Sequence, residues 1–100
     1  MGKMAVLINK MHAYRILLES MVNSYPEING VLNQLHGLFT EIDSGLLIPP
    51  CDDCYRSPFH PDVHSFYGPG TSLSIAESEF ICALEDWPSK PWFQALSNAK

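Results

Sequence analysis

Apolar residues recur every three or four positions along several stretches of the chain, which is the spacing of one face of an α-helix. The expected helices cover about residues 5–23, 26–44, 74–87 and 90–98. No stretch of useful length alternates between apolar and polar residues as a half-buried strand does. The pattern therefore predicts a single all-α domain over residues 1–100, a small bundle of three main helices plus a short C-terminal helix.

The apolar stripes of these helices define an expected core. Its predicted members are Leu7, Met11, Tyr14, Leu18, Ile28, Val31, Leu35, Leu38, Ile42, Phe80, Leu84 and Trp87. Trp92, Phe93 and Leu96 are expected to pack the last helix back onto the bundle. Gly30 and Gly37 lie seven residues apart on one helix face, and each costs about 1 kcal/mol of helix propensity. We expect another helix to approach that face closely.

Short polar signals set the expected helix ends. Ser24 with Glu27, and Ser74 with Glu77, have the three-residue spacing of a capping box, in which the first side chain caps the helix N-terminus. Gly45 is expected to end the second helix, since glycine accepts the left-handed backbone that terminates many helices.

An irregular segment of about residues 46–72 separates the second and third helices. It carries five prolines between Pro49 and Gly70, together with the aromatic residues Tyr55, Phe59, Phe66 and Tyr67. Disordered segments are poor in aromatic residues, so we expect this loop to be ordered. The four aromatic side chains either anchor the loop to the helices or form a surface for a partner.

Charge and composition narrow the expected partners. The chain has six basic and eleven acidic residues and a formal net charge of −5, which disfavours nucleic acid because phosphate binding needs a basic face. No apolar run is long enough to span a membrane, and no secretory signal is recognisable. The three cysteines, an odd number, fit the cytoplasm better than a secreted disulfide framework. Another protein is the expected partner.

One short stretch carries candidate metal ligands. Cys51, Cys54, His60 and His64 follow the spacing C-x2-C-x5-H-x3-H, and zinc takes four sulfur or nitrogen ligands of these types. A structural zinc site is one interpretation, although the spacing matches no standard motif. A polar surface loop that contains soft side chains by chance is the second. A redox pair is disfavoured, because the two intervening aspartates raise the pKa of the thiols and no strand precedes them.

The sequence favours binding over catalysis. Cys82 is expected to be a buried small residue rather than a nucleophile, and Glu77 and Glu79 to lie on a solvated helix face. Without a complete catalytic set, we expect a small acidic binding or regulatory protein. It is similar to immunity and inhibitor proteins in size, charge and fold class, with no shared motif. A zinc-binding module is the alternative, and a small enzyme is the third and least favoured hypothesis.

Overall fold

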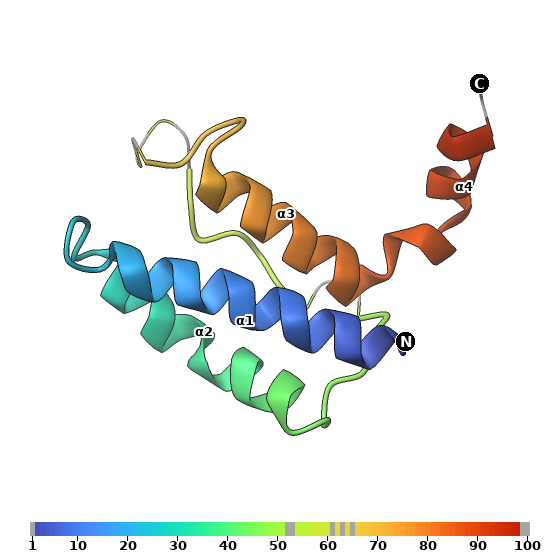
Figure 1. The fold of residues 1–100 in the computed structure, drawn as a ribbon, viewed down its shortest axis with the longest axis horizontal. Helices are drawn as coiled ribbons and strands as arrows, with labels where there is room; N and C mark the ends of the chain where they lie inside the picture. Colours follow the sequence, from blue (N-terminus) through green and yellow to red (C-terminus); the bar gives the residue numbers. More distant parts are fainter. Residues whose placement is uncertain (1, 52–53, 61, 63, 65, 99–100) are drawn as a thin grey trace.

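The computed structural model describes residues 2–51, 54–60, 62, 64 and 66–98, and this part of the chain is helical with no strand (Figure 1). The elements are α1 (Lys3–Met21), α2 (Ile28–Asp43), α3 (Ser72–Glu85), the short 3-10 helix η1 (Trp87–Ser89) and α4 (Pro91–Asn98). The predicted all-α fold is confirmed, with helix ends displaced by about two residues. Within the described residues, none of these helices is long and apolar enough to cross a membrane.

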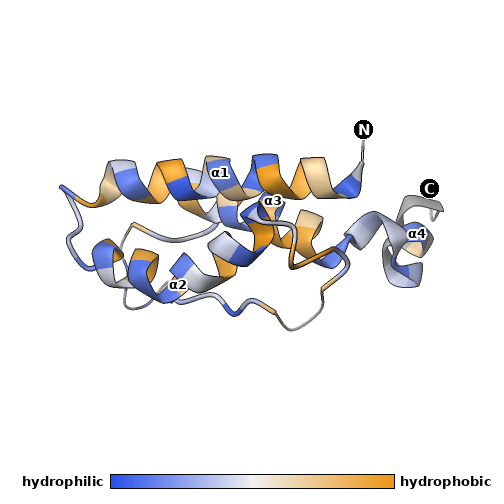
Figure 2. Cartoon of the chain, turned by 90° about the horizontal axis from the view of Figure 1, so that it is seen from below, coloured by the Kyte–Doolittle hydropathy of each residue, from blue (hydrophilic) through white to orange (hydrophobic). Residues whose placement is uncertain are grey.

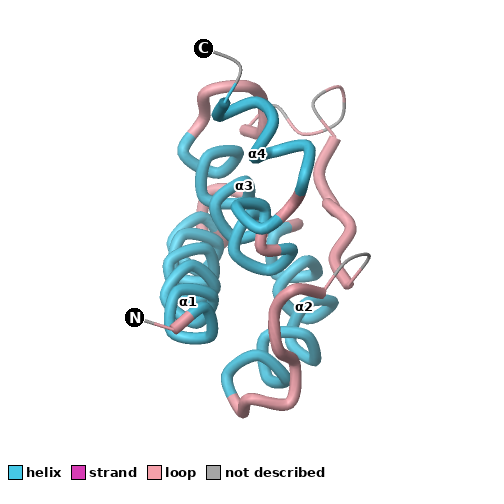
Figure 3. Tube along the Cα trace, turned by 90° about the vertical axis from the view of Figure 1, so that its right-hand side faces the viewer, coloured by secondary structure: helices cyan, strands magenta, loops and turns pink. Residues whose placement is uncertain are grey.

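Helix α1 lies at the centre of the bundle. It packs against both α2 and α3, whereas the backbones of α2 and α3 make no close contact with each other in the described part of the chain. The loop that follows α2 runs along the side between α2 and α3 (Figure 3). The amide of Cys51 donates to the carbonyl of Leu84 at 2.8 Å, which ties the start of this loop to the end of α3. The loop therefore supplies the third wall of the core.

The core contains most of the residues that the apolar stripes predict. Its buried members are Leu7, Met11, Tyr14, Leu18, Ile28, Leu35, Phe39, Ile42, Tyr55, Phe59, Leu73, Phe80 and Leu84. Apolar residues recur along α1 at the spacing of its buried face (Figure 2). Val31 and Leu38 are only half-buried against this core, and Trp87 lies outside it. Tyr55 and Phe59 come from the loop, so the loop belongs to the hydrophobic core.

The helix ends follow the predictions in part. Gly45 has a φ of +82°, and the amide of Leu46 donates to the carbonyl of Glu41 at 3.0 Å, so the predicted stop is confirmed. The predicted caps are wrong. Glu27, without a capping side-chain bond, precedes α2, and the Thr71 hydroxyl accepts from the Ser74 amide at the start of α3.

The two helical glycines do not mark a helix contact. A Cβ atom built on Gly30 or Gly37 would meet no atom within 4 Å, and both residues are exposed. The prediction of a closely approaching helix is wrong because α1 packs on the opposite, apolar side of α2. These glycines weaken α2 without a packing contact in return.

Helix α4 stands away from the other helices. Among the described elements it contacts η1 alone, and Figure 1 shows it projecting beyond the end of α3. The ring of Trp92 packs on Trp87 with 5.5 Å between centroids, and half of Trp92 is exposed. The prediction that α4 folds back onto the bundle is therefore wrong; the side chains of Phe93 and Leu96 lie outside the described part of the structure.

Candidate functional site

A carboxylate is buried at the junction of the loop, α1 and α3. Glu77 on α3 is 3% exposed. Its Oε2 accepts from the hydroxyl of Tyr55 at 2.7 Å, and its Oε1 accepts from the hydroxyl of Tyr67 at 2.5 Å. The Tyr14 and Tyr55 hydroxyl oxygens lie 2.6 Å apart. A hydroxyl has one proton, so Tyr55 donates to Glu77 and Tyr14 donates to Tyr55.

Stacked and edge-on rings surround this hydrogen-bonded chain. Tyr55 and Phe80 meet edge to face at 5.3 Å between centroids, and Tyr14 stacks on Phe80 at 5.4 Å. Phe59 stacks on Tyr67 at 5.2 Å, and Phe66 packs on Tyr25 at 4.4 Å. Aromatic pairs of this kind add about 0.5–1.5 kcal/mol each beyond their buried area. The rings and Glu77 together hold the loop on the helices.

The loop aromatics pack inward, against the helices. Tyr55 is 8% exposed and Phe59 is 6% exposed, so these two side chains offer little accessible surface, and contact of the loop aromatics with a partner stays a prediction. Phe66 and Tyr67 are half-buried and also pack against the core. The alternative interpretation, in which the aromatic residues anchor the loop, agrees with these contacts.

The buried tyrosines have a consequence at alkaline pH. Burial raises the pKa of both Tyr14 and Tyr55 far above the ordinary value of 10.0, and burial and the bond to Glu77 raise the pKa of Tyr67. Above pH 10 the unfolded chain releases these protons while the folded protein keeps them. The free energy of unfolding therefore falls as pH rises, by about 1.4 kcal/mol per pH unit for each fully buried tyrosine.

We expect helix loss and ionisation of Tyr14 and Tyr55 in one cooperative step above pH 10. Tyrosinate absorbance and circular dichroism, recorded together during an alkaline titration, measure the two events. Ionisation of all the tyrosines near pH 10 with the helices intact would contradict the buried network.

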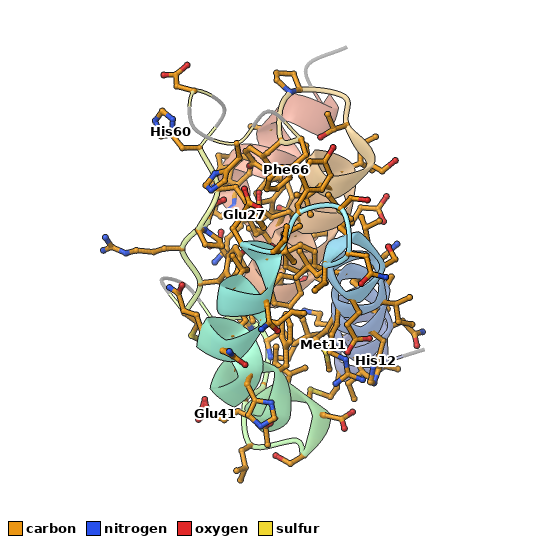
Figure 4. The ribbon with its side chains drawn as sticks, turned by 90° about the vertical axis from the view of Figure 1, so that its left-hand side faces the viewer. Met11, His12, Glu27, Glu41, His60 and Phe66 are labelled. Atoms are coloured by element: carbon orange, nitrogen blue, oxygen red, sulfur yellow. A yellow bond between two sulfur atoms is a disulfide. The ribbon has the colours of Figure 1, made fainter. Side chains whose placement is uncertain are left out.

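The structure separates the candidate metal ligands into two pairs. Cys51 and Cys54 are joined by a disulfide, with 5.8 Å between their Cα atoms. His60 and His64 meet in a turn, where the His60 amide donates to Nδ1 of His64 at 3.0 Å. The side chain of His60 lies at the outer edge of the loop, away from the helices (Figure 4).

These pairs do not form one ligand cluster in the described part of the chain. No group of three or more His, Cys, Asp or Glu side chains there could hold a metal ion, and the disulfide leaves neither Cys51 nor Cys54 as a thiolate. Asp52 and Asp53, which lie between the cysteines, are outside the described residues. Zinc binding by the reduced form of Cys51, Cys54, His60 and His64 stays a prediction, for which metal analysis under reducing conditions is the direct measurement.

A second feature is a groove between α1 and α3, at the end of the bundle from which α4 projects. Its volume is about 490 Å³. It is lined by Lys3, Val6, Lys10, Ser78, Glu79, Cys82, Ala83, Asp86 and Pro88. Two ion pairs cross it: Lys10 of α1 with Glu79 of α3 at 3.0 Å, and Lys3 of α1 with Asp86, the residue after α3, at 2.5 Å. The apolar side chains of Val6, Ala83 and Pro88 are thus bordered by paired charges.

The titratable groups of this groove are two ion pairs and one thiol. Burial raises the pKa of the Cys82 thiol, which keeps it protonated and makes it a poor nucleophile. The hydrogen bond from Lys3 lowers the pKa of Asp86, so that carboxylate stays ionised and paired.

The prediction of a solvated position for Glu77 is wrong, because this residue is buried and accepts the hydrogen bonds of the loop tyrosines. The helical spacing contains a sign of this burial. The buried residues of α3 are separated by steps of four, three and four, and they are Leu73, Glu77, Phe80 and Leu84. A charged residue within an apolar stripe indicates a buried carboxylate that needs donors. The tyrosines of the loop are those donors, and the sequence could not show which of them reach it.

Comparison with models of protein families, with curated proteins and with solved structures finds no match to this chain.

Proposed function

We propose that this protein is a small binding or regulatory module that recognises another protein through the groove between α1 and α3. The observation that carries the proposal is an apolar surface left uncovered between two helices, with Val6 39% exposed. A small domain has little reason to leave such a surface open unless something covers it in use.

The groove suits a helical segment of the partner. Two roughly aligned helices form its walls, and an amphipathic helix can lay its apolar face into a groove of this type. The formal net charge of −5 attracts a partner with basic residues around that apolar face. Trp92 is half exposed and packs on Trp87, the neighbour of Pro88 in the chain, and it is an aromatic side chain of the kind enriched at interfaces. We therefore propose a basic amphipathic helix as the recognised element.

A cytoplasmic location is part of this proposal. In that compartment the thiol pool would keep Cys51 and Cys54 reduced. The groove residues do not include this pair, so binding should not depend on their oxidation state.

The experiment is a comparison of two alanine-to-glutamate variants. Ala83 lines the groove, whereas Ala13 is exposed on α1 outside it. The partner is captured from a native extract, purified and titrated with each variant by calorimetry. We expect Ala83→Glu to weaken the binary complex by about 30-fold or more, because it places a charge against an apolar contact. Ala13→Glu should bind like the unmodified protein.

Equal affinity of the two variants would remove the groove from the interface. Failure of any captured protein to form a binary complex with the purified chain would overturn the proposed function itself. Circular dichroism of each variant shows that a lost interaction does not reflect a lost fold.

A further inference from the structure

A polar cleft lies between α1 and α2, and it shares no residue with the groove. Its volume is about 410 Å³, within the range of small-molecule sites. It is lined by Arg15, Glu19, Leu32, Asn33, His36, Phe39 and Thr40. The cleft therefore brings together a cation, an anion, polar side chains and apolar walls.

Arg15, which lines this cleft, has a side-chain donor without an acceptor. Among the residues that the structure describes, its Nε is the one buried side-chain nitrogen or oxygen without a hydrogen-bond partner. A buried donor without an acceptor costs about 1–3 kcal/mol, and more when it is charged. Arg15 and Glu19 are one helical turn apart, yet the described structure shows no ion pair between them. The positive charge of Arg15 is therefore not paired with an acidic side chain in the described structure, and an anionic ligand could supply that partner.

Neighbouring residues fix the position of the guanidinium. Nη2 of Arg15 lies 3.3 Å from Nδ1 of His12, and Nε2 of His12 lies 3.1 Å from Oδ1 of Asp43. Arginine can only donate, so His12 accepts at Nδ1 and donates from Nε2 to the carboxylate. His12 lies beside Met11 on α1 (Figure 4). The hydrogen bonds from His12 to Asp43 and from Arg15 to His12 hold one edge of the guanidinium in place. A side chain that is positioned in this way is suited to contact a ligand.

The charges around Arg15 select the ligand class. An arginine fork matches a carboxylate or a phosphate, but the carboxylate of Glu19 in the same cleft repels a multiply charged phosphate. Glu19 can instead accept from an ammonium group. Leu32 and Phe39 supply an apolar wall. We propose that this cleft binds a small zwitterion of the amino-acid class, with its carboxylate on Arg15, its ammonium on Glu19 and an apolar side chain against Leu32 and Phe39.

Binding would give the guanidinium of Arg15 an anionic partner. Nε itself has almost no accessible surface, so the ligand contact would fall mainly on the terminal nitrogens of the guanidinium. The carboxylate then accepts from Arg15 while His12 keeps its contact with Nη2. The exposed side chains of Asn33, His36 and Thr40 lie around the opening and have no side-chain hydrogen bonds in the described structure. They are free to contact the ligand.

Nuclear magnetic resonance titration of the nitrogen-labelled protein tests this site. The probes are leucine, isocaproate, which lacks the ammonium group, isopentylamine, which lacks the carboxylate, and inorganic phosphate. We expect leucine to shift amide signals of α1 and α2 around the cleft with the highest affinity of the four. Arg15→Gln should weaken leucine binding by about tenfold to a hundredfold, whereas Arg56→Gln, on the exposed loop, should leave it unchanged.

A second variant covers the case in which Arg15→Gln disturbs the fold. Glu19 is exposed, and Glu19→Gln should weaken leucine while leaving isocaproate unchanged or stronger. Three results would each overturn the proposal. They are no change of amide signals on addition of leucine, the same leucine affinity in Arg15→Gln as in the unmodified protein, and an affinity for phosphate as high as that for leucine. None of these results bears on the protein-binding groove, whose test uses Ala83.

Discussion

Replacement of Glu77 by alanine should lower the free energy of unfolding by about 3 kcal/mol or more. Glu77 accepts from both Tyr55 and Tyr67, and hydrogen bonds to a charged group contribute about 1.5–3 kcal/mol each. The variant leaves the two buried hydroxyls of Tyr14 and Tyr55 with only each other as acceptors, so one of their two protons has no partner. Urea unfolding measures the change.

Glu79→Ala is the matched control for this variant. It lies two residues further along α3, and its carboxylate pairs with Lys10 near the surface. Exposed ion pairs contribute about 0–1 kcal/mol, so the control should change stability little. A cycle with Tyr55→Phe adds a second check, because the two substitutions remove one shared bond and their effects should not add. Additive effects, or equal losses in Glu77→Ala and Glu79→Ala, would contradict a central role for Glu77.

Truncation of Phe59 to alanine should have the other large effect. Phe59 is 6% exposed and stacks on Tyr67, and loss of a buried phenylalanine side chain costs about 3–5 kcal/mol. We expect the loop of residues 46–71 to become sensitive to protease while the helices persist. Limited proteolysis and urea unfolding measure the two consequences.

Cys51→Ser separates aromatic packing from sulfur or metal chemistry. In reductant and chelator the unmodified protein has neither a disulfide nor a metal, so this variant should match it within about 0.5 kcal/mol. If Cys51→Ser loosens the loop as much as Phe59→Ala does, or if chelator alone exposes it, the aromatic anchor is not what orders this segment. A chelator effect would favour the zinc-binding alternative.

The helices could be predicted because their buried faces repeat along the chain. Leu7, Met11, Tyr14 and Leu18 follow the helical period, and all four are fully buried. Helix α4 shows the limit of such reasoning. Its sequence has an apolar face, but Asp86 adopts a left-handed backbone with φ of 52° and directs the following chain away from the bundle. Periodicity indicates that a face is apolar and carries no information on what covers it.

The candidate sites depended on contacts between distant segments. Tyr55 and Glu77 are 22 residues apart, and Tyr14 and Tyr55 are 41 apart, so no local spacing links them. The cleft around Arg15 arises in the same way, from side chains on two different helices. By contrast, the stretch of residues 51–64 suggests a metal site because its candidate ligands are close in sequence. Closeness along the chain did not bring those side chains into one cluster in the described structure.

The central claim is that the loop, α1 and α3 form one packed unit around Glu77. Native-state hydrogen exchange of the unmodified protein, in reductant and chelator, tests it most directly. The amide of Cys51, which donates to Leu84, should exchange with nearly the same free energy as the amides at the centre of α3. Exchange of the Cys51 and Tyr67 amides at the rate of an unstructured chain, with α3 still protected, would contradict the account.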